Sequence, residues 1–438
     1  MTYPEVVDYL NSFIDYEKIQ PKDYKGAFRL ERMKGLLAKL GNPQQNLKVI
    51  HIAGTKGKGS TAALIASILK ESGYRAGLYT SPHLISFRER IQIDGCMIGE
   101  EDLCRITTSA RKGLDQMRPE GLSFFEAYTA IAFLYFKEKI TDFAIMETGL
   151  GGRLDATNAV KRSISVITPI SYEHTRILGS TIRRIAREKA DIIKADSICI
   201  SAPQEKGALD VIERICKKRR AHLYLVGRDI HIDKGRFGQD EQYFNVWTRF
   251  SEYALIRLAL RGEHQIINAA TAIGAIEALR LYNVFIPHER IKSGISKTEW
   301  PGRMEIINSR PLVVADGAQN RASSRALIDG IKRHFNFRNL ILVLGTSKDK
   351  DQRGICKELS QAADYLVLTR ADNPRAQDPD ILKKYFRKEK KEVFPKSKDA
   401  MDRAFSLAGQ DDIIVVTGSL YLVGEVKKRL NHEKTDNS

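Results

Sequence analysis

The residues best suited to chemistry lie between positions 49 and 61, where a β-rich run enters a loop with three glycines and two lysines and a helical pattern follows. Glycines let backbone N–H groups close on phosphate oxygens because they carry no Cβ, and the start of a helix adds its positive end. Lys58 can reach the outer phosphates of a nucleotide, and the Ser60 hydroxyl can bind Mg²⁺. A glycine-rich turn without a ligand is the plain alternative, but strand, loop and helix stand in the order that phosphate binding requires.

The position of the lysine separates this loop from the commonest phosphate-binding pattern, G-x-x-x-x-G-K-[ST]. In this chain the lysine comes before the last glycine, so the loop reads Gly57-Lys58-Gly59-Ser60. This form resembles the loop of the Mur ligase superfamily, whose members form amide bonds with ATP. Residues 54–60 resemble in particular folylpolyglutamate synthase/dihydrofolate synthase. The resemblance implies that ATP binds to the residues of the loop, namely Gly54, Thr55, Lys56, Gly57, Lys58, Gly59, Ser60 and Thr61.

Strand-like and helical stretches alternate along most of the chain, which predicts the fold class α/β with a mostly parallel sheet and helices on both faces. The predicted strands are apolar without polar alternation, as expected for strands that are buried on both faces. Shorter, more polar segments near 222–262 predict a small antiparallel β addition. Together with this pattern, the resemblance implies a Mur-ligase-like, ATP-binding domain over residues 1–297. Besides the strand before the loop, its predicted strands are residues 76–80, 143–147, 164–168 and 198–201.

A Pro-Gly pair in the stretch 296–303 interrupts both helix and strand, so we expect a linker there. The alternation of strands and helices restarts after it. This pattern predicts a second, smaller, Rossmann-like α/β domain over residues 298–438, which the resemblance identifies as the glutamate ligase domain. Its predicted strands are residues 312–315, 340–344, 365–368 and 413–416.

Three residues of the first domain are candidates for binding metal together with Ser60. Glu147 ends a predicted strand, and a carboxylate at that end faces the ligand crevice of an open α/β sheet, where it can hold Mg²⁺. His174 follows the next strand, and the resemblance implies that it binds a second Mg²⁺. It is preceded by Glu173, where the family usually has Asp. Lys189 alone would be taken for a solvated lysine of a helix, but the resemblance implies that it is carbamylated and becomes a carboxylate-like metal ligand.

Three further residues are candidates for contacting ATP from outside the loop. The amide of Asn268 can both donate to and accept from an adenine edge, and the resemblance assigns it that contact. Arg303, from the linker, can neutralise charge on the transferred phosphoryl group, and Asp316, at a strand end, can orient nucleotide or substrate. The family normally has His and Pro where this chain has Gln319 and Arg321, and glutamine cannot carry a proton or a positive charge. The residues expected to act in catalysis are Lys58, His174, Lys189, Arg303 and Asp316.

Two stretches, residues 80–91 and 123–129, resemble the pterin-binding region of the family. A proline and several aromatic residues suit a loop that packs on a flat ring, although Phe124 and Phe125 fit a hydrophobic core equally well. The residues expected at the acceptor site are Ser81, Pro82, His83, Arg88, Phe125, Glu126, Thr129, Gly152 and Arg153.

The composition argues against several other classes of protein. With 438 residues and 42% hydrophobic residues the chain can form two or three ordinary cores. It has no apolar run of about 20 residues and no N-terminal signal core, so we expect neither a membrane span nor secretion. The five cysteines are scattered without a C-x-x-C pair, which suits the reducing cytoplasm and argues against a disulfide framework or a zinc site.

The resemblance extends over about residues 5–428 and implies an ATP- and Mg²⁺-dependent ligase that adds L-glutamate to dihydropteroate, to reduced folates, or to both. The acceptor carboxylate would attack the γ-phosphate of ATP, and the glutamate amine would then attack the acyl phosphate. A ligase of the same superfamily with a different carboxylate substrate is the first alternative. The net charge of +17 leaves open a basic, non-catalytic nucleic-acid binder; attraction of anionic substrates explains it equally well, and plain solvated surface is the interpretation that we favour for most of these charges. We expect a monomer with small-molecule substrates and no specific nucleic-acid or membrane partner.

Overall fold

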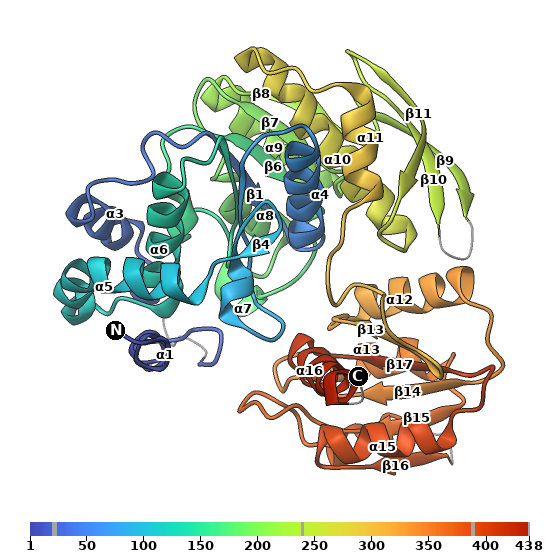
Figure 1. Cartoon of the computed structure of the whole chain (residues 1–438). Coiled ribbons are helices and arrows are strands. Elements are labelled where there is room, and N and C mark those ends of the chain that lie inside the picture. The colour runs from blue at the N-terminus through green and yellow to red at the C-terminus, as the bar shows by residue number, and fades with distance from the viewer. Residues whose placement is uncertain (20–23, 238–240, 387–389, 437–438) are drawn as a thin grey trace.

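The computed structural model describes residues 1–19, 24–237, 241–386 and 390–436 (Figure 1). An eight-stranded sheet forms the centre of an N-terminal domain, and a six-stranded sheet forms the centre of a C-terminal domain, so the predicted α/β class is confirmed. The two are joined by the segment between α11 (His288–Ser296) and β12 (Glu305–Ser309), where the linker was expected. The boundary at 297/298 itself stays a prediction.

The N-terminal sheet has the strand order β4-β3-β2-β5-β1-β6-β7-β8. Strand β1 lies between β5 and β6 and is parallel to both, so the phosphate loop that follows β1 starts beside the carboxyl ends of its two neighbours. All residues of β1 and β5 are buried, as their continuous apolar sequence predicts. The parallel strands are β1 (Val49–Ala53), β2 (Ala76–Tyr79), β5 (Phe143–Glu147), β6 (Ile164–Ile167), β7 (Ile198–Ser201) and β8 (His222–Leu225), and the antiparallel edge consists of β3 (Ile91–Ile93) and β4 (Cys96–Met97).

Helices cover both faces of this sheet (Figure 1). One face carries α4 (Lys58–Glu71), α10 (Glu263–Ala278) and α11, which share a core with the sheet. Among the residues that the structure describes, no helix is long and apolar enough to cross a membrane. The other helices are α1 (Tyr3–Asn11), α2 (Tyr24–Ala27), α3 (Leu30–Lys39), α5 (Glu100–Met117), α6 (Phe124–Glu138), α7 (Thr175–Leu178), α8 (Ile182–Ala190) and α9 (Lys206–Arg219), with 3₁₀ turns η1 (Phe87–Arg90), η2 (Arg118–Glu120), η3 (Ala156–Ala159) and η4 (Leu279–Tyr282).

The predicted antiparallel addition is present as a three-stranded sheet of β9 (His231–Phe237), β10 (Gln242–Trp247) and β11 (Glu252–Leu258), but it is shorter than expected. The start of the predicted region, residues 222–225, is strand β8, which pairs in parallel with β7 and extends the main sheet. Alternate residues of β10 are buried, because one face of this small sheet packs on the domain core.

The C-terminal sheet has the order β12-β13-β17-β14-β15-β16, in which only β12 is antiparallel to its neighbour. All four predicted strands are present, and helices cover both faces (Figure 1). After β12 the strands are β13 (Leu312–Asp316), β14 (Leu340–Leu344), β15 (Tyr365–Leu368), β16 (Lys391–Val393) and β17 (Ile413–Thr417), and the helices are α12 (Arg321–His334), α13 (Gln352–Ser360), α14 (Pro379–Lys383), α15 (Ser397–Leu407) and α16 (Leu420–Asp436).

Candidate active site

The glycines of the phosphate loop let two side chains from distant elements lie directly on its backbone. Gly57 has the left-handed φ of 81° and precedes the first residue of α4. A Cβ there would stand 2.3 Å from Oδ1 of Asn268, on α10, and a Cβ on Gly59 would stand 2.8 Å from Cζ2 of Trp300, in the linker. The Asn268 amide is held in place by donating to Gln265 Oε1 at 2.8 Å. The loop is therefore packed between the helix that follows it, α10 and the linker.

The first half of the loop is tied to the segment that follows β6. The backbone N–H groups of Thr55 and Lys56 donate to the carbonyl of Pro169 at 3.0 and 3.2 Å. The Thr55 hydroxyl donates to the Ser171 carbonyl at 3.2 Å. At the other end of the loop, the hydroxyl of Thr61 is buried and has no hydrogen-bond partner within the described chain. An orphaned hydroxyl at the start of a helix is suited to a phosphate oxygen.

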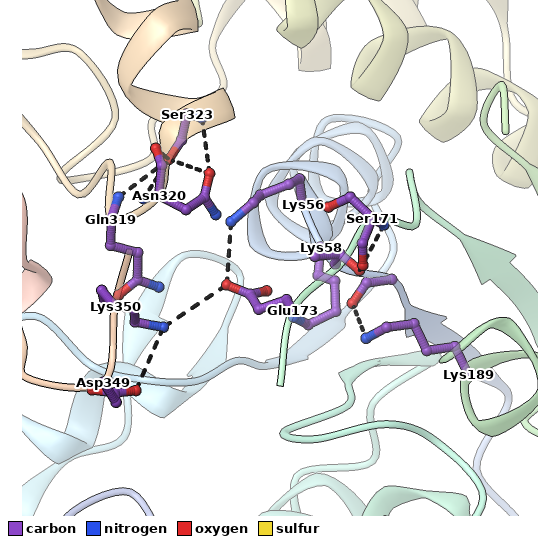
Figure 2. A network of polar contacts seen from close by, with 12 residues as sticks. Lys56, Lys58, Ser171, Glu173, Lys189, Gln319, Asn320, Ser323, Asp349 and Lys350 are labelled. Carbon is purple, nitrogen blue, oxygen red and sulfur yellow. Dashed lines mark hydrogen bonds and ion pairs between the residues drawn. The ribbon is translucent and has the colours of Figure 1, made fainter. Parts of the chain in front are cut away.

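Lysines and glutamates form two ion pairs beside the loop. Lys58 Nζ lies 3.6 Å from Oε1 of Glu147, whose other oxygen accepts from the Ser81 N–H at 3.2 Å. Burial raises the pKa of Glu147 above 4.5, and the nearby Lys58 only partly offsets this. Lys56 Nζ lies 3.3 Å from Oε1 of Glu173 (Figure 2). Burial alone would raise the pKa of Glu173, but lysines, with Lys56 the strongest, lower it to about 2.

Burial lowers the pKa of both Lys189 and His174. Burial, followed by repulsion from Lys58, lowers the pKa of Lys189 to about 7. Its ammonium donates to the Gly54 carbonyl at 2.7 Å, so it lies directly behind the phosphate loop (Figure 2). Burial also lowers the pKa of His174 to about 4, which leaves its imidazole neutral and available as a ligand.

Asp316 and Arg303 lie together where the linker enters the C-terminal domain. The Asp316 carboxylate accepts from the N–H groups of Met304 at 2.9 Å and Ala318 at 2.8 Å. Burial raises the pKa of Asp316, and the Arg303 guanidinium opposes that rise. A Cβ on Gly317 would stand 2.7 Å from Arg303 Nη1, so this glycine makes room for the arginine. Asp316 thus fixes the backbone on which Arg303 is carried.

The residues expected to bind metal come from four elements around the loop. Ser60 is on α4, Glu147 ends β5, His174 precedes α7 and Lys189 is on α8. No group of three His, Cys, Asp or Glu side chains that could hold a metal ion is present in the described part of the chain. Mg²⁺ usually takes one or two carboxylates together with substrate phosphates rather than a cage made of protein alone. A hydroxyl and a buried carboxylate beside a phosphate loop fit that manner of binding.

The loop expected to contact the acceptor bridges the two domains. The Ser81–Pro82 peptide is cis, and His83 Nδ1 accepts from Arg90 Nε at 2.9 Å. Leu84, two residues after Pro82, packs against α16, because a Cβ on Gly424 would stand 2.0 Å from the Leu84 carbonyl oxygen.

Several other residues expected at the acceptor site are already engaged within the N-terminal domain. The Arg88 guanidinium bonds to Ile98 O and to Glu100, and that of Arg153 bonds to Glu188. The carboxylate of Glu126 receives both Arg32 Nε and Nη2 at 2.8 Å and also caps the start of α6.

The remaining three line the glycine-rich loop after β5 or the helix beside it. The ring of Phe125 lies on Gly149, where a Cβ would stand 2.7 Å from its Cζ. Thr129 is buried, with its hydroxyl 3.0 Å from that of Tyr79. Gly152 lies so close to the end of α8 that a Cβ would meet the Lys189 carbonyl at 2.8 Å. The roles of all these residues in binding the acceptor stay predictions.

Comparison with known proteins agrees with this arrangement. Residues 52–276 match the Mur ligase middle domain, and residues 302–420 match the Mur ligase glutamate ligase domain. The dihydrofolate synthase/folylpolyglutamate synthase of Bacillus subtilis is 37% identical over 92% of this chain and 94% of its own length. This chain belongs to the folylpolyglutamate synthase/dihydrofolate synthase family of Mur ligases. The Mycobacterium tuberculosis folylpolyglutamate synthase complexed with ADP has a TM-score of 0.89 and 31% identity, with 98% of each chain covered. The E. coli FolC structure, in complex with DHPP and ADP, has a TM-score of 0.87 and 27% identity, with 98% of each chain covered.

Sequence reasoning missed three residues that the structure brings to the junction of the two domains, close to the expected site residues. The sequence alone assigned no role to Lys350, Arg375 or Glu17. Lys350 Nζ is 3.9 Å from Oε1 of Glu173, and Arg375 donates to the Glu17 carbonyl and pairs with Asp349 at 2.7 Å. Alternating lysines and aspartates at 348–351, in the loop after a predicted strand, were the signal that could have pointed to Lys350.

Proposed function

We propose that this protein is an ATP-dependent ligase that joins L-glutamate to dihydropteroate, to a reduced folate, or to both. One observation carries the proposal. The phosphate loop lies where the two domains meet, with Asn268 and Trp300 against its glycines and Lys350 of the C-terminal domain directed at Glu173 beside it. Such a junction can bring a nucleotide held by one domain to an amino acid held by the other. The relatives named for this activity, and their complexes with ADP and DHPP, support it.

The side chains at this junction have distinct tasks in the reaction. The acceptor carboxylate attacks the γ-phosphate of ATP, and the glutamate amine attacks the acyl phosphate and releases phosphate. Lys58 and Arg303 supply positive charge for the transferred phosphoryl group. Asp316 positions Arg303 by accepting hydrogen bonds from the backbone N–H groups of Met304 and Ala318. Closure of the junction would keep water away from the acyl phosphate.

Ser60, Glu147 and His174 are the residues that we propose hold Mg²⁺, which when bound offsets the charge of phosphate and carboxylate groups. The neutral state of His174 leaves a lone pair free for this purpose. We also propose that Lys189 is carbamylated, because only a neutral amine reacts with CO₂ and the pKa of Lys189 is lowered to about 7. Asn268 is proposed to contact the nucleotide from its place on the loop.

The proposal is tested by mass spectrometry of products from purified protein with ATP, Mg²⁺, L-glutamate and either dihydropteroate or tetrahydrofolate. We expect a glutamyl residue to be added to at least one of the two acceptors. Addition to neither, with ADP still bound in calorimetry, would contradict the acceptor class and favour a Mur ligase with another carboxylate substrate. Gln319 is the feature that favours this second candidate, because it faces the junction where the family has a histidine (Figure 2). We further propose that the enzyme is monomeric and cytoplasmic, with its five cysteines reduced.

A further inference from the structure

Glu173 is placed between positive groups of both domains. Its oxygen Oε1 lies 3.3 Å from Nζ of Lys56, in the phosphate loop, and 3.9 Å from Nζ of Lys350, in the C-terminal domain (Figure 2). Both ammonium groups therefore share one carboxylate oxygen. The three residues lie after three different strands, β1, β6 and β14, so the contact is made only when the domains are arranged as in this structure.

Lys350 is held loosely although it is mostly buried. Its side chain is 12% exposed, and its two carboxylate neighbours, Glu173 and Asp349, are 3.9 and 4.0 Å away. No hydrogen bond from its ammonium is present within the described residues. A mostly buried ammonium without a hydrogen bond is costly, so this lysine is stabilised by both carboxylates, that of Asp349 in its own loop and that of Glu173 from the other domain.

The loop that carries Lys350 is firmly braced within its own domain. The N–H of Lys348 donates to the Arg375 carbonyl at 2.8 Å, and Ser347 forms a β-bridge with Ala376. On its far side this pair of loops reaches the N-terminal domain again, because Arg375 donates to the carbonyl of Glu17. A displacement of Lys350 therefore requires movement of the whole two-loop unit rather than of one side chain.

We propose that Glu173 is a positioning residue that fixes the C-terminal domain over the phosphate loop by sharing its carboxylate between Lys56 and Lys350. Without the carboxylate, two lysines of like charge face each other across the junction and push the domains apart. The nucleotide site itself, on the N-terminal domain, keeps its loop and its cations. The loss therefore falls on the step that needs both domains. This inference rests on the proposed ligase activity only for its kinetic test.

The kinetic test compares Glu173→Gln, Lys350→Met, the double variant and the control Lys348→Met. Lys348 is a matched control because it is an exposed lysine of the same loop, and its ammonium bonds only to the Pro374 carbonyl within the described residues. For Glu173→Gln and for Lys350→Met we expect kcat to fall about tenfold or more while KM for ATP changes little, since misplacement by about 1 Å can cost about 100-fold in rate. The double variant should fall no further than either single one, because both remove the same contact. The control should keep wild-type activity.

A second measurement does not depend on activity. A zero-length carbodiimide joins a carboxylate to an amine only when the two are in contact, and peptide mapping should recover a Glu173–Lys350 link that is absent from Lys350→Met. Additive kinetic losses, a rise of KM for ATP in place of the fall in kcat, or absence of the crosslink would overturn the proposal. If the wild-type protein ligates neither acceptor, the proposed function fails, and the crosslink alone then tests the Glu173–Lys350 contact.

Discussion

Replacing Gly57 by alanine tests directly whether the phosphate loop works in the conformation seen here. Gly57 has φ 81°, and a Cβ would stand 2.3 Å from the Asn268 amide oxygen. A left-handed conformation costs a residue with a side chain about 1–2 kcal/mol. Moving the Asn268 amide away breaks its hydrogen bond to Gln265, worth about 1 kcal/mol. We therefore expect the variant to relax to another loop conformation that lies about 2–3 kcal/mol below the native one.

Nucleotide binding would have to restore the native loop, so the same free energy appears as lost affinity. About 2–3 kcal/mol corresponds to ADP binding that is about 30- to 150-fold weaker. Isothermal titration calorimetry with ADP measures this loss. The matched control is Gly73→Ala, at the end of the same helix, where φ is also 81° but nothing lies within 4 Å of a Cβ. The control should lower the unfolding midpoint and leave ADP affinity unchanged.

The steric part of the effect can be isolated in an Asn268→Ala background. Once the amide is removed, Gly57→Ala should weaken ADP binding only by the conformational cost of about 1–2 kcal/mol, because the Cβ no longer meets the amide oxygen. Wild-type ADP affinity in Gly57→Ala, or an equal loss of affinity in Gly73→Ala, would refute the reasoning that the nucleotide binds this loop conformation.

Three other predictions concern Lys189, Arg303 and the Glu17–Arg90 pair. Because the pKa of Lys189 is lowered to about 7, its amine is mostly neutral at pH 8, and ¹³C-bicarbonate should give a carbamate NMR signal and raise the turnover of CO₂-depleted enzyme. Lys189→Met should show neither effect, and a signal that persists in the variant would contradict the assignment. Arg303→Met should lower kcat by about 10²–10³-fold, as for other lost contacts to developing charge, and a change confined to KM would argue against that role. Burial alone would raise the pKa of Glu17, but the Arg90 guanidinium, 2.6 Å away, outweighs it and holds the pKa below 4.5. The Glu17–Arg90 ion pair therefore contributes its full stabilisation above pH 4.5 and loses it as the pH falls through the lower folded-state pKa. The difference in unfolding midpoint between wild type and Glu17→Gln should narrow below pH 4.5 and stay constant above it.

Much of the fold could be predicted because the physical causes are local in sequence. A run such as residues 413–416 is apolar at every position, and a strand buried on both faces is the structure that needs this. Residues 222–225 were harder to predict, since β8 is an edge strand with one exposed and two half-buried positions and so lacks that signature. Its place in the main sheet follows from pairing with β7, which is a tertiary contact and leaves no local pattern.

Glu126 shows how a sequence motif can have two readings. Its resemblance to the pterin-binding stretch predicts a role at the acceptor site. The same four residues, Ser123 to Glu126, have the S-x-x-E spacing of a capping box, and the structure contains that box at the start of α6. The carboxylate also pairs with Arg32, 94 residues away in sequence, and spacing alone cannot indicate such a partner.

In the candidate site, too, the positions of residues along the chain could be predicted from the sequence, whereas their contacts with distant residues could not. The sequence shows that Glu147 and Asp316 end apolar strands and that His174 follows one, and within each sheet parallel strands bring such ends to one edge. Which lysine each carboxylate meets depends on side-chain reach of a few ångströms across loops that are far apart in the chain. Lys58 could have paired with either nearby glutamate, yet it lies by Glu147, while Glu173 is taken by Lys56 and, from the other domain, Lys350. A glutamate at 173 is one methylene longer than the aspartate that the family usually has. Since the Glu173–Lys350 contact is already 3.9 Å, a shorter side chain in the same backbone position would lose it, so this departure from the family pattern is what allows this one contact between the domains.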